Sequence, residues 1–274
     1  GGGLPSHPAL KYGAPGAPGA ESVRAFRGYV TSVDSRSRNP RWVQEHLTRA
    51  GIKGPGDRKG SHFREDRSQD SGLRVHLSDY RGSGYDRGHL APAGSHKGSQ
   101  EEMDETFNLS NITPQVGAGF NRDYWARLEA FVKDTTREAE DVYVTTGPLY
   151  LPSPDGAGGW KMNHPVLGSP PRLVEVPTHF YKVVLAEVQA PGGGRRAVVG
   201  AFVLPNAPIP HGEPLSRFLV RLDDLERAAG LRFYPKYLTP ERRAALDALV
   251  PTYRALLAPS STQLLLEAPS GGGG

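Results

Sequence analysis

Residues 85–92 read Tyr-Asp-Arg-Gly-His-Leu-Ala-Pro, and this stretch decides how the chain is interpreted. Three glycines fall in the seven residues before His89, and Pro92 follows it, so the backbone turns too often here for a helix interior. We therefore expect the His89 side chain on a loop or at a strand end. A neutral imidazole near pH 7 can accept a proton from water, which is the usual task of histidine in hydrolysis.

A second run of interest, residues 111–129, begins about twenty positions later. The pattern predicts a helix over Asn121–Glu138, with apolar residues at three- and four-residue spacing on one face: Trp125, Leu128 and Val132. On such a helix Asn121 and Glu129 lie along one edge, beside the buried face. Taken alone, Asn121 is explained as a helix N-cap, and Glu129 with Lys133 as an ordinary surface ion pair.

The composition is that of a globular chain with long loops. At 274 residues the chain can form one or two domains, and 34 glycines with 25 prolines indicate much irregular backbone. No apolar run approaches the roughly 20 residues of a membrane helix, and the start lacks the pattern of a signal peptide. The chain has no cysteine, which excludes disulfides, thiolate nucleophiles and cysteine-bound zinc.

Positive charge is concentrated in the first part of the chain, around His89. Residues 21–100 hold 15 Lys/Arg against 9 Asp/Glu, whereas residues 101–274 hold 17 against 20. Since Lys and Arg that neutralise phosphates dominate nucleic-acid affinity, a polyanionic substrate could approach the basic part. A merely solvated basic surface explains the charge equally well.

The pattern divides the chain into a flexible arm (1–20), a single domain (21–258) and a disordered tail (259–274), because both ends are rich in Gly, Pro and Ala without apolar periodicity. Within the domain we expect strands over Ala25–Val33, Arg41–Leu47, Leu73–Leu77, Asp141–Leu151, Arg172–Val188 and Arg196–Leu204. Helices are expected over Gln100–Glu105, Asn121–Glu138, Pro214–Ala229 and Pro240–Leu257. Strands and helices without a regular βαβ period predict an α+β fold.

The segment Asp86–Pro92 resembles the DRGHxxP signature of the sugar-non-specific DNA/RNA endonucleases of the ββα-metal (His-Me finger) type. Further segments are similar to the mitochondrial branch of that family, endonuclease G: Asp79–Gly84, Leu109–Asn111, Asn121–Glu129, Thr146–Leu149, Val176–Phe180 and Leu204–Pro208. The resemblance covers roughly residues 25–235. It implies a central mixed, mainly antiparallel sheet flanked by helices.

The resemblance also implies roles for single residues. His89 would be the general base that activates water, and Asn121 the one direct protein ligand of a hydrated Mg²⁺. Glu129 would hold a water of that ion. Asn111 would orient the histidine or the scissile phosphate, while Arg87 and Arg64 would contact phosphate: these are the positions that match the family pattern.

A single neutral ligand suits Mg²⁺, which keeps most of its waters and its full charge; Mn²⁺ could substitute. The resemblance implies hydrolysis of DNA and RNA to 5′-phosphate and 3′-hydroxyl ends, with little base specificity because the backbone is the target. Two features depart from the family pattern: Lys133 replaces an arginine, and the chain after Leu238 matches little. The alternatives are a catalytically silent nucleic-acid-binding relative, a metal phosphoesterase for small substrates, and a secreted or periplasmic scavenging nuclease of the same family.

Location and assembly follow from the resemblance alone. Endonuclease G implies the mitochondrial intermembrane space with release to the nucleus, so we expect an Arg-rich, acid-poor segment ahead of residue 1 in the full-length gene. The family commonly forms homodimers. The strands between Asp141 and Leu204 are candidate interface material, unless they are buried within one subunit.

Overall fold

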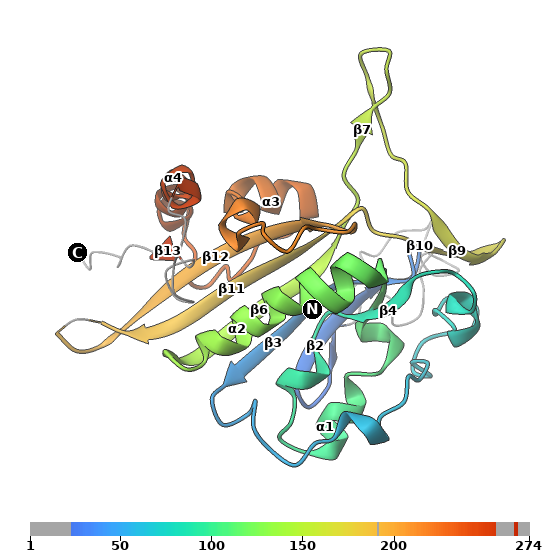
Figure 1. Ribbon diagram of the computed structural model, residues 1–274, viewed down its shortest axis with the longest axis horizontal. Helices are drawn as coiled ribbons and strands as arrows, with labels where there is room; N and C mark the ends of the chain where they lie inside the picture. Colours follow the sequence, from blue (N-terminus) through green and yellow to red (C-terminus); the bar gives the residue numbers. More distant parts are fainter. Residues whose placement is uncertain (1–22, 191, 256–265, 268–274) are drawn as a thin grey trace, which may run out of the picture.

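A seven-stranded antiparallel sheet forms the centre of the computed structural model, which describes residues 23–190, 192–255 and 266–267 (Figure 1). The strand order is β1-β2-β3-β6-β11-β12-β13. The bounds are β1 Arg24–Ala25, β2 Tyr29–Asp34, β3 Asn39–Thr48, β6 Ala139–Leu149, β11 His179–Gln189, β12 Arg195–Pro205 and β13 Leu266–Glu267. Every pairing in this sheet is antiparallel, so the predicted α+β class with a mainly antiparallel sheet is confirmed.

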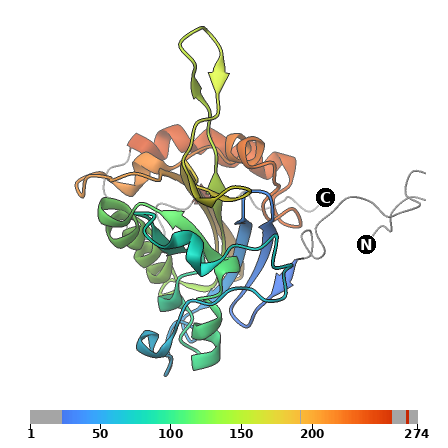
Figure 2. The ribbon, with the colours of Figure 1, turned by 90° about the vertical axis from the view of Figure 1, so that its right-hand side faces the viewer.

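Helices cover both faces of the sheet, as Figures 1 and 2 show. On one face lies α2 (Ala126–Thr135), entered through a π-helical segment η6 (Gly117–Trp125); α3 (Leu222–Ala229) and α4 (Pro240–Ala255) lie on the other. The short α1 (Gln100–Glu105) lies below β2 and β3 in the view of Figure 1. The α2 face holds the residues singled out in the sequence, because η6 carries Asn121 and α2 carries Glu129 toward the histidine motif.

Three small two-stranded sheets complete the fold. The pair β4 (Asp86–His89) and β5 (Ile112–Gln115) carries the histidine motif. The hairpin β7–β8 (Ser153–Pro154 with Trp160–Lys161) protrudes from the body in both views, and β9–β10 (Val166–Ser169 with Arg172–Glu175) packs below it. Single 3₁₀ turns lie at η2 Arg58–Gly60, η3 Leu77–Tyr80, η4 Ala93–Ser95, η5 Leu109–Asn111 and η7 Leu215–Phe218.

The predicted strand Leu73–Leu77 is wrong. This segment forms turns that lead into η3, because carboxylates take the backbone donors that a neighbouring strand would have bonded. The Glu65 carboxylate accepts from Leu77 N at 3.2 Å, and the Asp79 carboxylate accepts from His76 N at 2.8 Å. The apolar side chain of Val75 is nevertheless buried, in a small second core.

Four longer predictions are interrupted in the structure. The helix over Asn121–Glu138 divides into η6 and α2 and ends at Thr135. The strand over Ala25–Val33 divides into β1 and β2, and that over Arg172–Val188 into β10 and β11. The helix over Pro214–Ala229 divides into η7 and α3, because Leu219 forms a bridge with Phe202 and Val220 N donates to Ala201 O at 2.9 Å. The Ala25–Val33 segment folds back on itself so that β1 pairs with β2, whereas β10 pairs with β9 and β11 pairs with β6 and β12.

The predicted arm (1–20) lies outside the described residues, as does the predicted tail (259–274) apart from β13, which pairs with β12 at Val198 and Val199. Within the described residues, no helix combines the length and apolarity needed to cross a membrane. The strands β6 and β11 have neighbours on both sides, so neither supplies a free edge for pairing between subunits.

Candidate active site

His89 ends β4, where its backbone pairs with Ile112 of β5. Its ring packs edge-on against Phe107 at 4.7 Å and obliquely against Phe63 at 5.5 Å between centroids. Only 8% of the residue is exposed, and its Nε2 has no hydrogen-bond partner among the described residues. Gly88 is needed beside it, because a Cβ there would lie 2.1 Å from Oε1 of the buried Gln115. The predicted strand-end position of His89 is confirmed.

Asn111 fixes the backbone that follows the histidine. Its Nδ2 donates to Ala91 O at 2.9 Å and to Thr106 O at 2.8 Å, and its Oδ1 accepts from Ala91 N at 2.9 Å. The Asn111 backbone oxygen accepts from Leu90 N at 3.0 Å. Since Asn111 is fully buried and these bonds occupy its amide, it can orient the histidine strand but not contact a phosphate.

Asn121 lies in the irregular turn that opens the α2 helix. Gly119 has φ +79°, and the Asn121 N–H reaches back five residues to Val116 O. The sequence alone suggested that Asn121 caps a helix, but its side chain does not do so. Its Nδ2 donates to Asp86 Oδ2 at 2.9 Å. Asp86 also accepts two bonds from Arg122, at 2.8 and 2.9 Å, which holds the pKa of this carboxyl below its usual value. Asp86 thus links the histidine motif to η6 through its bonds to Asn121 and Arg122. The Asn121 Oδ1 has no hydrogen-bond partner among the described residues.

One cavity of about 440 Å³ brings these segments together. Residues from β4, the turn after it, η6 and α2 line it, together with an arginine from η2. The lining residues are Arg58, Arg87, His89, Pro92, Ala93, Gly94, Ser95, Asn121, Arg122, Ala126, Glu129, Ala130 and Lys133. Among them are His89, Arg87, Asn121 and Glu129, all predicted from the sequence as site residues.

The predicted phosphate contact Arg64 is not among the lining residues. Its backbone is bonded to Phe107 and Leu109, in a bridge beside Asn108, and its side chain is exposed. The same loop supplies Arg58 instead, which the sequence did not distinguish from its neighbours. Only the count of basic residues in that loop could have pointed to it, because the position of a side chain on a long loop depends on the folded backbone.

Burial and charge set the protonation of the site. Burial, then the positive charges of Arg58 and His96, lower the pKa of His89 to about 3, so the imidazole is neutral at pH 7. Burial raises the pKa of the half-buried Glu129 to about 7, against the opposing influence of Lys182. Behind His89, His96 bonds Glu45 at 2.8 Å and Glu102 at 2.9 Å; although burial opposes it, these carboxylates raise the pKa of His96 to about 9.

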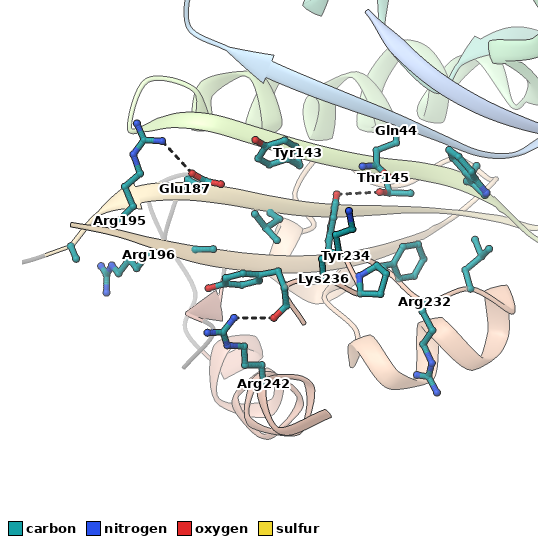
Figure 3. Close-up of a pocket in the computed structure, with 18 residues that line it drawn as sticks. Gln44, Tyr143, Thr145, Glu187, Arg195, Arg196, Arg232, Tyr234, Lys236 and Arg242 are labelled. Carbon is teal, nitrogen blue, oxygen red and sulfur yellow. Dashed lines mark hydrogen bonds and ion pairs between the residues drawn. The ribbon is translucent and has the colours of Figure 1, made fainter. Parts of the chain in front are cut away.

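A larger cavity, about 1360 Å³, lies on the opposite face of the sheet (Figure 3). Aromatic side chains such as Tyr143, Tyr234 and Tyr237 line it, and its arginines have partners: Arg195 pairs with Glu187, and Arg242 donates to Tyr237 O. None of the residues that carry the sequence motif lines this cavity. Size therefore does not identify the active site here; the convergence of a histidine, an amide, a carboxylate and arginines does.

Comparison with known proteins agrees with this geometry. The profile of the DNA/RNA non-specific endonuclease family matches residues 6–239. A nuclease of Syncephalastrum racemosum is 48% identical over 233 residues, which are 83% of this chain and 71% of that one. The mitochondrial endonuclease G of Homo sapiens is 43% identical over 239 residues, covering 87% and 76%. A solved structure of the EndoG/EndoGI complex superimposes with a TM-score of 0.75 at 43% identity, covering 84% of this chain and 91% of that one.

The chain therefore belongs to the DNA/RNA non-specific endonuclease family, and it is a nuclease, a hydrolase of phosphodiester bonds. Within the family it is similar to endonuclease G, as its motifs predicted, and it shares the ββα-metal fold. Its substrate is nucleic acid, and nucleases of this family are metal-dependent.

Proposed function

We propose that the chain hydrolyses DNA and RNA with His89 as general base and with Mg²⁺ held by Asn121. The observation that carries the proposal is the convergence on one cavity of His89, Asn121, Glu129 and two arginines from separate segments. Water attacks phosphorus and His89 accepts its proton, while the bond from phosphorus to the 3′ oxygen breaks and this oxygen takes a proton from solvent water. The products are a 5′-phosphate and a 3′-hydroxyl.

A neutral imidazole at 8% exposure is ready to accept a proton, but a pKa of about 3 makes it a weak base in the free protein. Burial is the largest cause of this low pKa and the charge of Arg58 the second, so an anionic phosphate beside Arg58 would offset part of the lowering and strengthen the base. Arg87 stacks on Phe63 with its guanidinium 4.3 Å from the ring centroid, at the same cavity. Arg87 and Arg58 are the two phosphate-binding arginines of the proposal, and Asn111 orients the histidine.

The donor set fits a hydrated Mg²⁺. The Asn121 Nδ2 donates its hydrogen bond to Asp86. The amide oxygen of Asn121 therefore remains available to bind a cation. Among the described residues no cluster of three or more His, Cys, Asp or Glu could hold a metal, and a single-amide site does not require one. When bound, Mg²⁺ or Mn²⁺ would stabilise the charge on the pentacovalent phosphorus and on the leaving oxygen. Glu129, on the same cavity wall, would hold a water of the ion.

Plasmid nicking tests the proposal. We expect cleavage that depends on Mg²⁺ and a loss of at least 10²-fold in kcat for His89→Ala, since general-base catalysis contributes about 10²–10⁴-fold. The matched control is His211→Ala, an exposed histidine outside the cavity, which should keep wild-type activity. Activity of His89→Ala within about threefold of wild type would contradict the assignment. A metal-independent wild type would contradict the role of Asn121. Cleavage of small phosphodiesters in place of plasmid would favour the phosphoesterase alternative.

We further propose a mitochondrial location and a homodimer. The compartment is supported by the name of the human relative, while the Syncephalastrum racemosum relative is called only a nuclease, which keeps a secreted form as the alternative. The hairpin β7–β8 supports the dimer, because it protrudes with Trp160 72% exposed and Met162 following it at 55%. Residues 21–258 would form one domain in each subunit.

Sedimentation tests the dimer. At micromolar concentration wild type should sediment at about twice the 29.6 kDa chain mass. Trp160→Ser should shift it toward the monomer. A monomeric wild type would refute the dimer but leave the chemistry untouched.

A further inference from the structure

Lys182 is a buried cation that the proposed hydrolysis does not yet use. It lies in β11, directly across from Thr146 of β6, it contacts Trp125 at the start of α2, and it is 1% exposed. Its Nζ donates to Thr146 Oγ1 at 2.7 Å and to Leu90 O at 3.4 Å. Leu90 follows His89, so this ammonium contacts the backbone that carries the general base. Removing a charge from water costs several kcal/mol, and two neutral oxygens offset this poorly.

The negative charges that compensate the Lys182 ammonium are those of Glu45 and Glu129, and Glu129 lines the cavity of the active site. The Lys182 Nζ lies 5.0 Å from the ring centroid of Trp125, one helical turn before Glu129. The pKa of Lys182 is lowered by burial, while Glu45 and Glu129 act in the opposite direction. Glu45 is shared with His96 in an ion pair of 2.8 Å. No ion pair within 4 Å joins Glu129 to a cation among the described residues, so Lys182 is its main source of opposite charge.

We propose that Lys182 is a positioning residue for phosphodiester hydrolysis. From behind the site, its ammonium compensates the Glu129 carboxylate and holds the Leu90 carbonyl, so that Glu129 and His89 present their functional atoms to the same cavity. The inference rests on the role proposed for Glu129. Lys182 itself is too deeply buried to touch substrate, so its effect passes through these two neighbours.

A purely structural Lys182 would have different consequences. If the side chain only fills space and satisfies Thr146 and Leu90, a neutral group of the same length with an NH₂ at its end would serve equally well. If its charge matters, the neutral group should slow the reaction at saturating substrate and leave substrate binding unchanged. A measurement of kcat, rather than of folding, therefore distinguishes the structural role of Lys182 from the charge-dependent one.

The absence of cysteine from the chain allows this comparison at one position. Lys182→Cys protein is alkylated in the unfolded state and refolded. With 2-bromoethylamine it gains an ammonium at the length of lysine. With iodoacetamide it gains a neutral amide whose NH₂ occupies the same place. Thermal unfolding and circular dichroism report the fold of each product, and wild type taken through the same treatment is the control.

We expect the aminoethylated protein to have a kcat within about threefold of wild type. The carbamidomethylated protein should have a kcat at least tenfold lower, with KM for DNA within about twofold and a higher Mg²⁺ requirement. Equal kcat values for the two products, or a loss confined to KM, would overturn the proposal. Activity of His89→Ala reports separately on the proposed function, so its failure is distinguishable from this one.

A Glu129→Gln background covers the case in which the neutral product does not fold alone, since removing the carboxylate removes the unpaired buried charge. There the two alkylated products should have the same residual kcat, because both still donate to Leu90 O and the carboxylate on which the charge of Lys182 acts is gone. A tenfold difference that persists in this background would show that Lys182 acts independently of Glu129. That result would overturn the proposal.

Discussion

The buried cluster of His96 with Glu45 and Glu102 should make the fold sensitive to alkaline pH. His96 is 1% exposed and joins the turn after the histidine motif to β3 and α1. Burial opposes its charge, yet the two carboxylates raise its pKa from 6.5 to about 9. Because the folded chain then binds more protons than the unfolded chain, this stabilisation is fully present below about pH 6.5. It is lost as pH rises through about 9.

The difference between pH 6.5 and about 9 corresponds to about 3 kcal/mol of unfolding free energy, at roughly 1.4 kcal/mol for each pH unit. Urea unfolding of wild type and His96→Gln at pH 6 and pH 10 measures it. At pH 6 the unfolding free energy of wild type should exceed that of His96→Gln. At pH 10 this difference in unfolding free energy should be smaller by about 3 kcal/mol. The matched control is His46→Gln, whose histidine pairs with Asp141 on the surface with 49% of its side chain exposed, and which should change by less than about 1 kcal/mol. A gap for His96→Gln that stays constant between the two pH values would refute the reasoning.

Three further predictions concern the site. Asn121→Ala should need much more Mg²⁺ for the same rate, because the substitution removes the proposed direct ligand of the ion; an unchanged Mg²⁺ titration would contradict this. Gly88→Ala should lower stability by about 1–3 kcal/mol through overlap with Gln115, whereas a Cβ on Gly94 meets nothing within 4 Å and should cost little; equal melting temperatures would show that Gln115 moves away freely. Nuclease binding to DNA should weaken steeply with salt and depend little on sequence, and filter binding at fixed salt with two unrelated duplexes would expose a preferred site if one exists.

The sequence predicted those parts of the site whose positions follow from local backbone. Gly88 and Pro92 place His89 at a strand end, and the cavity contains His89, Asn121 and Glu129. The regular helix predicted from Asn121 begins only at Ala126, because Asn121 lies in the π-helical segment η6. The N-cap interpretation of Asn121 was wrong because its partner, Asp86, lies 35 residues earlier in the chain. Periodicity describes a residue's own element and gives no information about such a distant partner.

Other parts of the structure depended on contacts that no local pattern encodes. Residues 73–77 have the composition of a strand, but Asp79 and Glu65 accept from the backbone N–H groups of His76 and Leu77, and no strand of the described residues pairs with this segment. Arg58 and Arg64 lie six residues apart on one polar loop, and only the folded course of that loop selects Arg58 for the cavity. Lys182 was predicted within a strand, but its burial depends on α2 closing over the sheet.

Three buried charged residues lie close to one another, and their position suggests what they contribute besides stability. Glu45, His96 and Lys182 all lie behind the cavity, where each desolvated charge is costly and where apolar side chains of similar volume would often be as stable or more so. Stability alone therefore does not account for them. Each contacts or electrostatically influences a residue of the proposed mechanism: His96 acts on His89, and Lys182 and Glu45 act on Glu129. We infer that the polar layer between the sheet and α2 sets the charge states of the general base and of the carboxylate beside Asn121, because positive charges act on both: those of Arg58 and His96 favour the neutral form of His89, and those of Lys182 and Arg58 favour the ionised form of Glu129.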